Sequence, residues 1–292
     1  MGMLLLNDLA LAGAPVLSQR EFEKISKLAY ERFGLDIPGT KQDLVAARLG
    51  KVLRQLSMKS FEQYYNYVLS DKSGAALTTF ADRLTTNHTS FFRESRHFDI
   101  LRKILLPEVR MRRRIDIWSA ACSSGEEPYT IAMSLLEEMP DASLRVHIKA
   151  TDLCTQVLTT AKNGIYEADK VHGIPPALLH KYMAKDMSGS RSAWRIKPEV
   201  RRMVEFERVN LMEALPHGYR CPAIFCRNIM IYFDKPTQQR LVQRLTEHLE
   251  DGGYLFIGHS ESLNGIAHGL DYVSPAAYRK PGRLSRNSGG NR

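Results

Sequence analysis

From residue 114 onward, short runs of strand-forming residues alternate with segments of helical periodicity. The strand-like runs are RIDIWSA, RVHIKATD, VEFERVN, AIFCRN and GYLFIGHSES, with helical patterns over 128–139 and 155–162. Strands that alternate with helices form a mostly parallel sheet, because each connection must cross over the sheet. The alternation therefore predicts an α/β fold, a doubly wound Rossmann-like sheet with helices on both faces.

The residues before this region have no strand pattern and are predicted to form helices. Ser18-Gln19-Arg20-Glu21 has the form of a capping box, and apolar residues then recur at helical spacing up to Gly34. FEQYYNYVL and AALTTFADRL give two further helical patterns. Between them and the first helix, the segment 41–56 has one apolar side and one basic side. The apolar side comprises Leu44, Val45, Leu49, Val52, Leu53 and Leu56, and the basic side Lys41, Arg48, Lys51 and Arg54.

These patterns predict two domains. Residues 1–86 form an all-α N-terminal domain with a basic face, and residues 87–282 form the α/β domain. Residues 164–203 interrupt the alternation with a polar, proline-containing segment, which we predict to be an inserted small β-subdomain. The polar, glycine-rich residues 283–292 are predicted to be disordered.

Composition narrows the classes of function. A hydrophobic fraction of 43% and a charged fraction of 25% are ordinary for a soluble protein. No apolar run approaches the roughly 20 residues of a membrane span, and no Lys or Arg precedes the apolar opening, so we expect a cytoplasmic protein without a signal peptide. The net charge of +9 favours an anionic partner, which could be nucleic acid, acidic lipid or an acidic protein. The four cysteines have no metal-site spacing and are expected to be reduced.

The loop after the first predicted strand, ACSSGEEPYT, points to a particular kind of ligand. Its small residues and glycine let the backbone approach a ligand closely, and ligands of such sheets bind at the carboxyl ends of the strands. Glu126 and Glu127 follow at the helix start, where a phosphate site would exclude acids. The loop thus favours a cationic or hydroxyl-bearing group. The alternative is that both acids only complement the helix dipole.

Asp152 supports a nucleoside ligand. It ends the second predicted strand, where nucleotide-binding sheets hold ribose hydroxyls with a carboxylate. The loop lacks GxGxxG, which argues against a dinucleotide. S-adenosylmethionine fits these features, because it combines a ribose with a sulfonium and an amino group and has no phosphate.

Six motifs carry a family resemblance: TTNHTSFFRE, WSAACSSGEEPYT, TDLC, VNLME, CRNIMIYFDK and LFIGHSES. In this order, after a basic helical domain, they resemble the chemotaxis receptor methyltransferase (CheR) family from about residue 18 to about residue 280. The resemblance implies a protein-glutamate O-methyltransferase that uses S-adenosylmethionine, releases S-adenosylhomocysteine and needs no metal. It also implies the substrate, glutamate side chains on the cytoplasmic helices of bacterial chemoreceptors.

The resemblance also implies residue roles. Glu127 would accept the cofactor's amino group, Asp152 would hold the ribose, and Tyr232 and Arg93 would orient the reacting groups. The implied cofactor-binding residues are Asn87, Thr89, Arg93, Glu127, Asp152, Asn210, Leu211, Arg227 and Asn228. Asn87 could instead cap a helix, and Tyr232 could belong to the core. Phe91 and Phe92 are expected to pack and to position Arg93.

Expected partners follow from the same resemblance. Arg48, Lys51 and Arg54 are predicted to dock acidic receptor helices, although such a face could simply be solvated. In some members the insertion binds a short receptor C-terminal tail by adding a strand, and SRSAWRIKPE could supply the sheet edge here. A regulatory protein could bind the helical domain, whereas nucleic acid is not an expected partner.

Two other functions stay open at this point, and one residue departs from the family pattern. A nucleic-acid methyltransferase would explain the charge, but CRNIMIY replaces the NPPY-type loop of amino-directed enzymes. A non-catalytic adaptor that binds S-adenosylmethionine is the other alternative. Similar proteins often have an aspartate just before the AIFCRN strand, where this chain has Cys221 and Pro222. Because proline cannot donate to a strand ladder, the resemblance does not determine the local geometry there.

Overall fold

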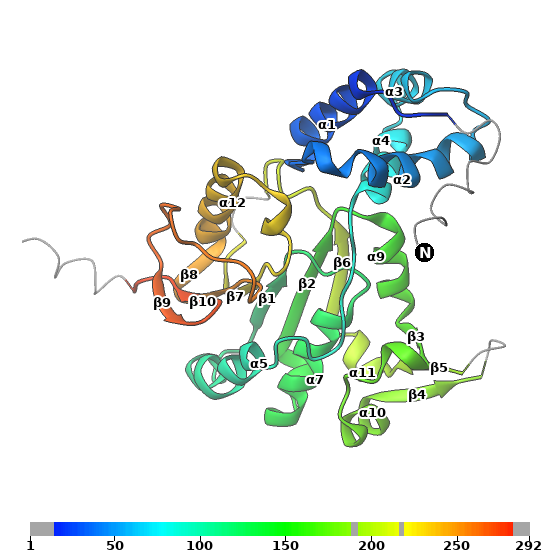
Figure 1. Ribbon diagram of the computed structural model, residues 1–292. Helices are drawn as coiled ribbons and strands as arrows, with labels where there is room; N and C mark the ends of the chain where they lie inside the picture. The colour runs from blue at the N-terminus through cyan, green and yellow to red at the C-terminus, as the bar shows by residue number, and fades with distance from the viewer. Residues whose placement is uncertain (1–14, 188–191, 216–218, 283–292) are drawn as a thin grey trace, which may run out of the picture. The chain divides into compact units, whose positions relative to one another are not determined.

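The computed structural model describes residues 15–187, 192–215 and 219–282, so the predicted disordered tail, 283–292, lies outside the described residues. The chain divides into two compact units, residues 1–86 and 87–292 (Figure 1). Neither unit has, in the part that the structure describes, a helix long and apolar enough to cross a membrane.

The first unit is built from helices, as predicted. Its α-helices are α1 (Gln19–Phe33), α2 (Gln42–Gln55), α3 (Phe61–Ser70) and α4 (Ala75–Leu84), with a 3-10 turn, η1 (Gly39–Lys41), before α2. The predicted capping box starts α1, because the Ser18 hydroxyl accepts the Glu21 N–H while the Glu21 carboxylate accepts the Ser18 N–H. Gly34, with φ 71°, ends α1 in the left-handed conformation that favours glycine.

The buried stripe of α2 is narrower than the sequence predicts. Val45, Leu49, Val52 and Leu53 are buried, but Leu44 and Leu56 are 42% and 43% exposed. Leu44 lies seven residues before Lys51, which is about two helical turns, so both side chains share the solvent face. The assignment of Leu44 and Leu56 to the apolar side is therefore wrong.

The second unit contains the predicted α/β sheet. Its order is β6-β2-β1-β7-β8-β10-β9, and the first five strands in this order pair in parallel (Figure 1). The strands are β1 (Ile115–Ser119), β2 (Val146–Asp152), β6 (Val204–Arg208), β7 (Cys221–Phe225), β8 (Leu249–Phe256), β9 (Asp271–Ser274) and β10 (Ala277–Arg279). The antiparallel β9 and β10, which extend the sheet beyond β8, were not predicted.

Helices connect these strands. Before β1 lie α5 (Arg96–Ile100), the π-helical η2 (Leu101–Leu105) and α6 (Leu106–Val109). The crossovers then contain α7 (Glu126–Glu138), α8 (Ala142–Arg145), α9 (Thr155–Asn163) and α12 (Lys235–His248), with the short η4 (Met230–Tyr232) before α12. The sequence analysis therefore gave the correct fold class.

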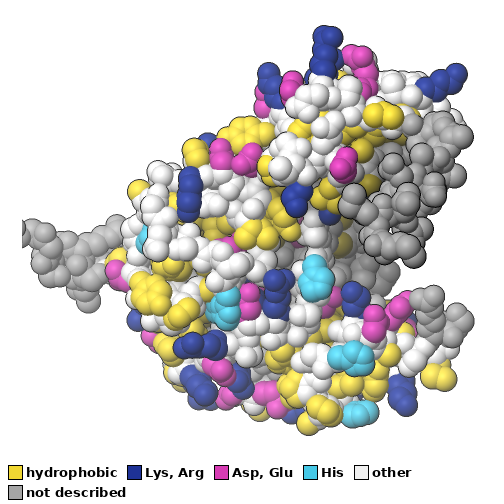
Figure 2. Space-filling model, viewed as in Figure 1, with side chains coloured by type: hydrophobic (Ala, Val, Ile, Leu, Met, Phe, Trp, Pro, Cys, Tyr) yellow, Lys and Arg dark blue, Asp and Glu magenta, His cyan; other side chains and the backbone are white. Residues whose placement is uncertain are grey.

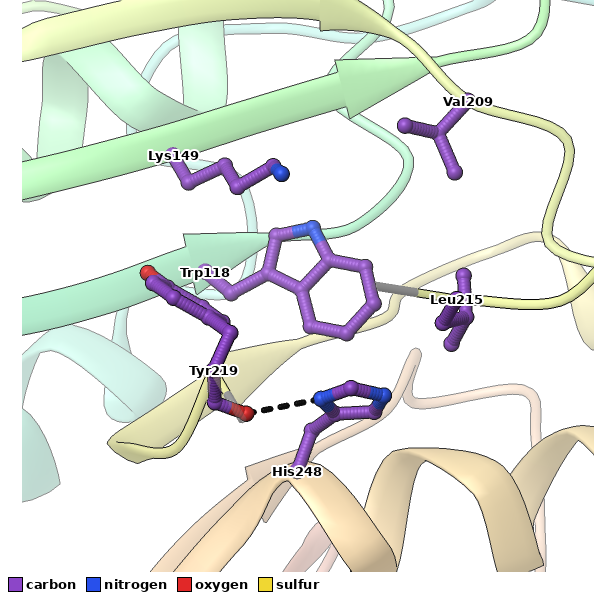
Figure 3. A pocket seen from close by; sticks show the side chains of 6 residues that line it. All are labelled: Trp118, Lys149, Val209, Leu215, Tyr219 and His248. Carbon is purple, nitrogen blue, oxygen red and sulfur yellow. Dashed lines mark hydrogen bonds between the residues drawn. The ribbon is translucent and has the colours of Figure 1, made fainter. Parts of the chain in front are cut away.

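Side chains alternate between the two faces of the sheet. Ser119 of β1 faces α7, where its hydroxyl donates to Glu127, whereas Trp118 faces the other way and packs edge-on against His248 of α12. The described part of the connection 209–220 contains no helix. A hollow therefore remains on this second face, lined by Trp118, Lys149, Val209, Leu215, Tyr219 and His248 (Figure 3).

The inserted segment forms a separate three-stranded sheet with the order β3-β5-β4. Its elements are β3 (Ile165–Glu167), η3 (Ala168–Lys170), α10 (Pro176–Tyr182), β4 (Met183–Asp186), β5 (Ala193–Ile196) and α11 (Pro198–Arg201). β5 comes from SRSAWRIKPE and pairs with both neighbours. The prediction that this segment supplies a sheet edge is wrong, because a central strand has both ladders filled. The edges of this sheet are β3 and β4.

Pro222 lies inside β7 and disturbs its ladder. The register between β7 and β8 shifts between Cys221 and Ala223, and β7 pairs with β1 only from Ala223 onward. Since proline has no N–H to donate, the regular pairing starts after it. Cys226 and the residues that follow it lie beyond this irregularity.

Candidate active site

The loops at the carboxyl ends of the strands are tied to one another. The Ser123 N–H, after β1, donates to the Asp152 carboxylate at 2.8 Å, and the Ser123 hydroxyl donates to the Asn87 carbonyl at 2.9 Å. The Val209 N–H, after β6, donates to the Asp152 carbonyl at 3.0 Å. Asn87, Asp152 and the loop that continues into Asn210 therefore meet at one rim, as the sequence predicts for ligand-binding loops.

The loop 120–125 has a conformation that depends on Gly125. This residue has φ 95° and caps the start of α7. A Cβ at this position would lie 2.9 Å from both the Ala161 Cβ and the Tyr166 hydroxyl, so no larger residue fits. The same hydroxyl donates to the Ser124 carbonyl at 2.7 Å. Tyr166 belongs to β3, so the inserted sheet helps to fix the loop.

Gly125→Ala is expected to destabilise the protein by about 1–3 kcal/mol, through overpacking and a strained backbone. It should also weaken S-adenosylhomocysteine binding, because the loop must move away from Tyr166. Denaturant unfolding and calorimetric titration would measure the two effects. Gly50→Ala is the matched control, since nothing lies within 4 Å of its Cβ position in α2. Equal affinity in the Gly125 and Gly50 variants would contradict this account of the loop.

Glu126 and Glu127 have different surroundings, although they are adjacent. Glu126 is buried, its carboxylate accepts the Ser124 hydroxyl at 2.7 Å, and burial raises its pKa. Glu127 accepts the Ser119 hydroxyl at 2.7 Å on one oxygen and Arg227 Nη1 at 2.9 Å on the other. Both carboxylates therefore make specific side-chain contacts, so complementing the helix dipole does not fully account for them.

Arg227 lies at the centre of a buried charge network. Its side chain is 3% exposed and contacts Glu127, Glu94 and the Arg93 carbonyl, with Nη2 2.8 Å from Glu94 Oε2 and 2.6 Å from that carbonyl. Burial alone would raise the pKa of Glu94, but the hydrogen bond and charge of Arg227 outweigh it, so the pKa is lowered. Arg227 is thus engaged by protein groups, although the family resemblance implies a cofactor contact.

Two carboxylates of the site were missed by the sequence analysis. Glu94 follows Arg93 in FFRE, and besides Arg227 it accepts the His259 N–H at 3.2 Å. Glu261, in GHSES, accepts the N–H groups of Asn228, Met230 and Gly258 at 3.0, 2.7 and 2.6 Å. Burial raises the pKa of Glu261, against the effect of these donors. Both residues lie within quoted motifs, but their sequence positions gave no sign of these distant partners.

Glu261 holds Asn228 in an uncommon conformation. Asn228 has φ 58°, in the left-handed region, and its side chain lies so close to Gly258 that a Cβ there would overlap it. The Asn228 amide also points to Glu94, with 3.5 Å between Nδ2 and Oε1. The Asn228 side chain, just after β7, therefore packs directly against the Gly258 backbone, just after β8.

The segment that contains Arg93 is held in a strained conformation. Phe92 and Glu94, on either side of Arg93, have φ 54° and 55°, which is uncommon for residues other than glycine and is often found at functional sites. Arg93 is half-buried and its Nη1 donates to the His88 carbonyl at 3.1 Å. Phe91 is buried, with its ring 4.9 Å from that of Tyr166. The expectation that Phe91 and Phe92 pack is confirmed.

The structure also tests the alternatives for Asn87 and Tyr232. Asn87 lies between the end of α4 at Leu84 and the start of α5 at Arg96, so it does not cap a helix. Tyr232 is half-buried in η4, which excludes a position in the closed core. Thr89 lies in the same loop as Asn87, on the way to Arg93.

Asn210 and Leu211 form a folded turn after β6. The Asn210 side chain accepts the Met212 N–H and donates to Glu213, both at 3.0 Å. The carbonyl of the buried Leu211 accepts Arg244 Nη1 from α12 at 3.0 Å. The turn is therefore fixed in place at the rim that Asp152 also borders.

The three basic residues predicted to dock a substrate differ in their contacts. Arg48 donates to the Leu84 carbonyl at 2.6 Å and to the Thr86 hydroxyl at 2.7 Å, so it caps the end of α4. Lys51 and Arg54 are exposed on α2. Arg48 thus has a structural role within the first unit, and the exposed charge comes mainly from the other two.

Family comparisons identify both units. Residues 20–85 match "CheR methyltransferase, all-alpha domain", and residues 87–278 match "CheR methyltransferase, SAM binding domain". The chain belongs to the CheR methyltransferase family. Its second unit is therefore a domain that binds S-adenosylmethionine, and the resemblance stated from the sequence motifs is confirmed.

Relatives of this CheR family member are similar over nearly their whole lengths. A chemotaxis protein methyltransferase of Borreliella burgdorferi is 38% identical over 273 residues, which cover 90% of this chain and 95% of the relative. Proteins of the same name from Salmonella typhimurium and Escherichia coli are each 38% identical, over 90% and 86% of this chain and 90% and 87% of the relatives. The chain is an S-adenosylmethionine-dependent methyltransferase of the chemotaxis type.

Proposed function

We propose that the protein transfers the methyl group of S-adenosylmethionine to glutamate carboxylates of bacterial chemoreceptors, forming methyl esters in the cytoplasm. The observation that carries this proposal is the match of both units to chemotaxis protein methyltransferases over most of the chain. The rim at which Ser123 joins Asn87 to Asp152, with Glu127 at the start of α7, supports it, because these residue types can bind the cofactor's hydroxyl and amino groups.

The donor set at the rim fits S-adenosylmethionine. A carboxylate offers about four acceptor positions. Asp152 accepts the Ser123 N–H on one oxygen and the Cys154 N–H on the other, and in this proposal the same carboxylate would hold the ribose hydroxyls. Glu127 would receive the amino group, while Asn210 and Leu211 would border the adenine. Asn87 and Thr89 would complete the binding site, and the Gly125 loop lets the backbone come close.

The reaction needs no general base, because a glutamate side chain, with a reference pKa of about 4.3, is already ionised at pH 7. S-adenosylmethionine supplies an activated methyl group on a sulfonium. A carboxylate oxygen of the receptor forms the new bond to the methyl carbon as the carbon–sulfur bond breaks, so no proton moves. Arg93 and Tyr232 would orient that carboxylate and replace its water, which accelerates transfer through positioning. Asn228 would line the pocket beside them.

Arg227 would act through its neighbours in this scheme. Its guanidinium binds Glu127 and Glu94 and the Arg93 carbonyl, so it fixes the groups on both sides of the cofactor's amino end. We therefore assign it a positioning role. Glu94, next to Arg93, and Glu261, in the loop after β8, both contact the segment that follows β7.

Receptor recognition is proposed to use the exposed part of α2. Lys51 and Arg54 can attract an acidic helix, and the exposed Leu44 on the same face offers an apolar contact. A receptor tail, where one exists, would add to β4 or β3, since β5 is the central strand of the small sheet.

Reversing both charges, Lys51→Glu with Arg54→Glu, is expected to raise the KM for receptor and to reduce its dependence on salt. The affinity for S-adenosylhomocysteine should not change, because both residues lie in the first unit. Steady-state methylation at two ionic strengths, with calorimetry of cofactor binding, would measure this. Lys27→Glu with Arg20→Glu, at two exposed positions of α1, is the charge-matched control. An unchanged KM in the double variant would remove α2 from receptor recognition.

Nucleic acid is disfavoured as the substrate, because the relatives that match most of the chain are named chemotaxis protein methyltransferases. On the face shown in Figure 2, Lys and Arg side chains are scattered among acidic and apolar ones and form no continuous basic area. A protein that follows a phosphate backbone needs such an area.

Product chemistry tests the proposal. The purified protein would be incubated with methyl-labelled S-adenosylmethionine and membranes that contain chemoreceptors, and the labelled receptor would be treated with mild alkali. We expect label on the receptor that is released as methanol, since carboxyl esters are alkali-labile. Alkali-stable label would indicate another acceptor, and cofactor binding without any label would favour an adaptor. Membranes without receptors are the control.

A further inference from the structure

Glu94, His97 and His259 form a compact group of side chains beside the rim. One ligand atom from each lies within 4.8 Å of the others, and no other such group is found among the described residues. His97 comes from α5, Glu94 from the strained segment after Arg93, and His259 from the loop after β8. The reaction proposed above uses neither histidine side chain.

His97 is the unusual member of this group. Its side chain is fully buried, yet neither ring nitrogen has a hydrogen-bond partner among the described residues. Its Nδ1 lies 3.7 Å from Glu94 Oε2, which is too long for a hydrogen bond. Leaving buried polar groups unpaired is unfavourable, so a ligand for these nitrogens would stabilise the protein.

His259 provides access from solvent. Its side chain is exposed, and its ring centre lies 5.1 Å from that of His97 in an edge-on arrangement. Its main-chain N–H donates to Glu94 Oε1 at 3.2 Å, so the residue stays beside the carboxylate whatever its side chain does. The imidazole can therefore turn toward His97 and Glu94 without a change in the backbone.

The charges around the group permit a cation. Arg227 contacts Glu94 and Glu127, and Arg93 contacts Glu94 at 4.0 Å, so these four side chains together carry no net positive charge that would repel an ion. The four cysteines, which would otherwise compete for a soft metal, are all buried. Two imidazoles and one carboxylate are a donor set that binds zinc and similar ions, with water filling the remaining position.

We propose that Glu94, His97 and His259 form a binding site for a divalent transition-metal ion, and that its occupation inhibits the enzyme. The ion would draw the Glu94 carboxylate away from Arg227 and Asn228, which would release the Arg93 segment and the end of β7. Metal binding is independent of the proposed function, whereas the inhibition rests on it. The ion takes no part in methyl transfer.

Calorimetric titration with zinc chloride tests the binding. We expect the wild-type protein to bind one equivalent and His259→Ala to lose at least tenfold in affinity. His172→Ala, which removes an exposed histidine from the inserted segment, is the matched control and should bind like the wild type. Cobalt(II) would give a visible absorption spectrum that disappears in the His259 variant. Magnesium, which prefers oxygen ligands, should not bind.

Measurements of turnover test whether the bound metal ion inhibits the enzyme. Zinc should inhibit the wild type reversibly, with recovery on chelation, and should inhibit His259→Ala at least tenfold less effectively. Without zinc, His259→Ala should turn over normally, because the main-chain contact to Glu94 is retained. No saturable zinc binding, or equal binding in the wild type and His259→Ala, would overturn the site. Binding without any effect on turnover would overturn the inhibition. Calorimetry needs no receptor, so a failure of the proposed substrate would not affect the binding result.

Discussion

Arg227→Met is expected to abolish methyl transfer and to lower the free energy of unfolding by about 3–5 kcal/mol. Methionine fills much of the same volume but cannot donate hydrogen bonds. Glu94 and Glu127 would then be left as buried carboxylates close to one another, without the cation that compensates them. The cost is therefore that of two uncompensated charges and exceeds the loss of one hydrogen bond.

Denaturant unfolding and receptor methylation would measure this prediction. Arg114→Met is the matched control, because Arg114 also pairs with a carboxylate, Asp116, but its side chain is 65% exposed. Exposed ion pairs contribute only about 0–1 kcal/mol, so this control should lose little stability. Arg227→Lys should be intermediate, since lysine keeps the charge but cannot bind two carboxylates with a planar fork. Equal losses in the Arg227→Met and Arg114→Met variants would show that the buried network is not important for stability.

Local sequence signals predicted the elements that place the site. The Ser18 capping box and Gly34 gave the bounds of the first helix, because both act within a few residues of the chain. The alternation of strands and helices predicted the sheet. The position of loops at the carboxyl ends of its strands then predicted Asp152 and Glu127 as site residues. These predictions depend on short-range periodicity, which one sequence contains, and on the rule that ligands bind at the carboxyl ends of parallel strands.

Long-range pairing was not predictable in the same way. Arg227 and Glu94 are 133 positions apart, and nothing in CRNIM shows that this arginine is turned toward a carboxylate of the FFRE motif. The central position of β5 has the same cause, since strand order in a small sheet depends on pairing between distant residues. Glu261 looked like an ordinary acid in GHSES, yet three backbone N–H groups converge on it.

The network also explains why an arginine that the family motif places at the site need not contact the cofactor. A preorganised site requires groups that hold the binding residues in place, and a buried guanidinium can join several segments at once. Arg227 joins the ends of α7 and β7 to the Arg93 segment through Glu127, Glu94 and the Arg93 carbonyl. In the proposed mechanism, the half-buried Arg93 and Tyr232 would then contact the substrate.

Arg93→Ala is expected to reduce kcat by about 10²–10³, the effect of removing one preorganised donor from a reaction centre. The fold should be retained. Within the described parts of the chain, the Arg93 side chain donates one hydrogen bond, to the His88 carbonyl at 3.1 Å, and forms a 4.0 Å ion-pair contact with Glu94. Contacts of this kind contribute about 1 kcal/mol or less.

Single-turnover methylation, with calorimetry of S-adenosylhomocysteine binding, separates the chemical step from affinity. The chemical step should lose more than cofactor affinity does, because Arg93 is assigned to orienting the receptor carboxylate as well as to cofactor contact. Arg96→Ala is the matched control, because this substitution removes the same charge three residues away, at an exposed position at the start of α5. Turnover in Arg93→Ala close to that of Arg96→Ala would remove Arg93 from the mechanism. Orientation would then have to come from Tyr232 and Asn228, the remaining polar side chains proposed to line this part of the pocket.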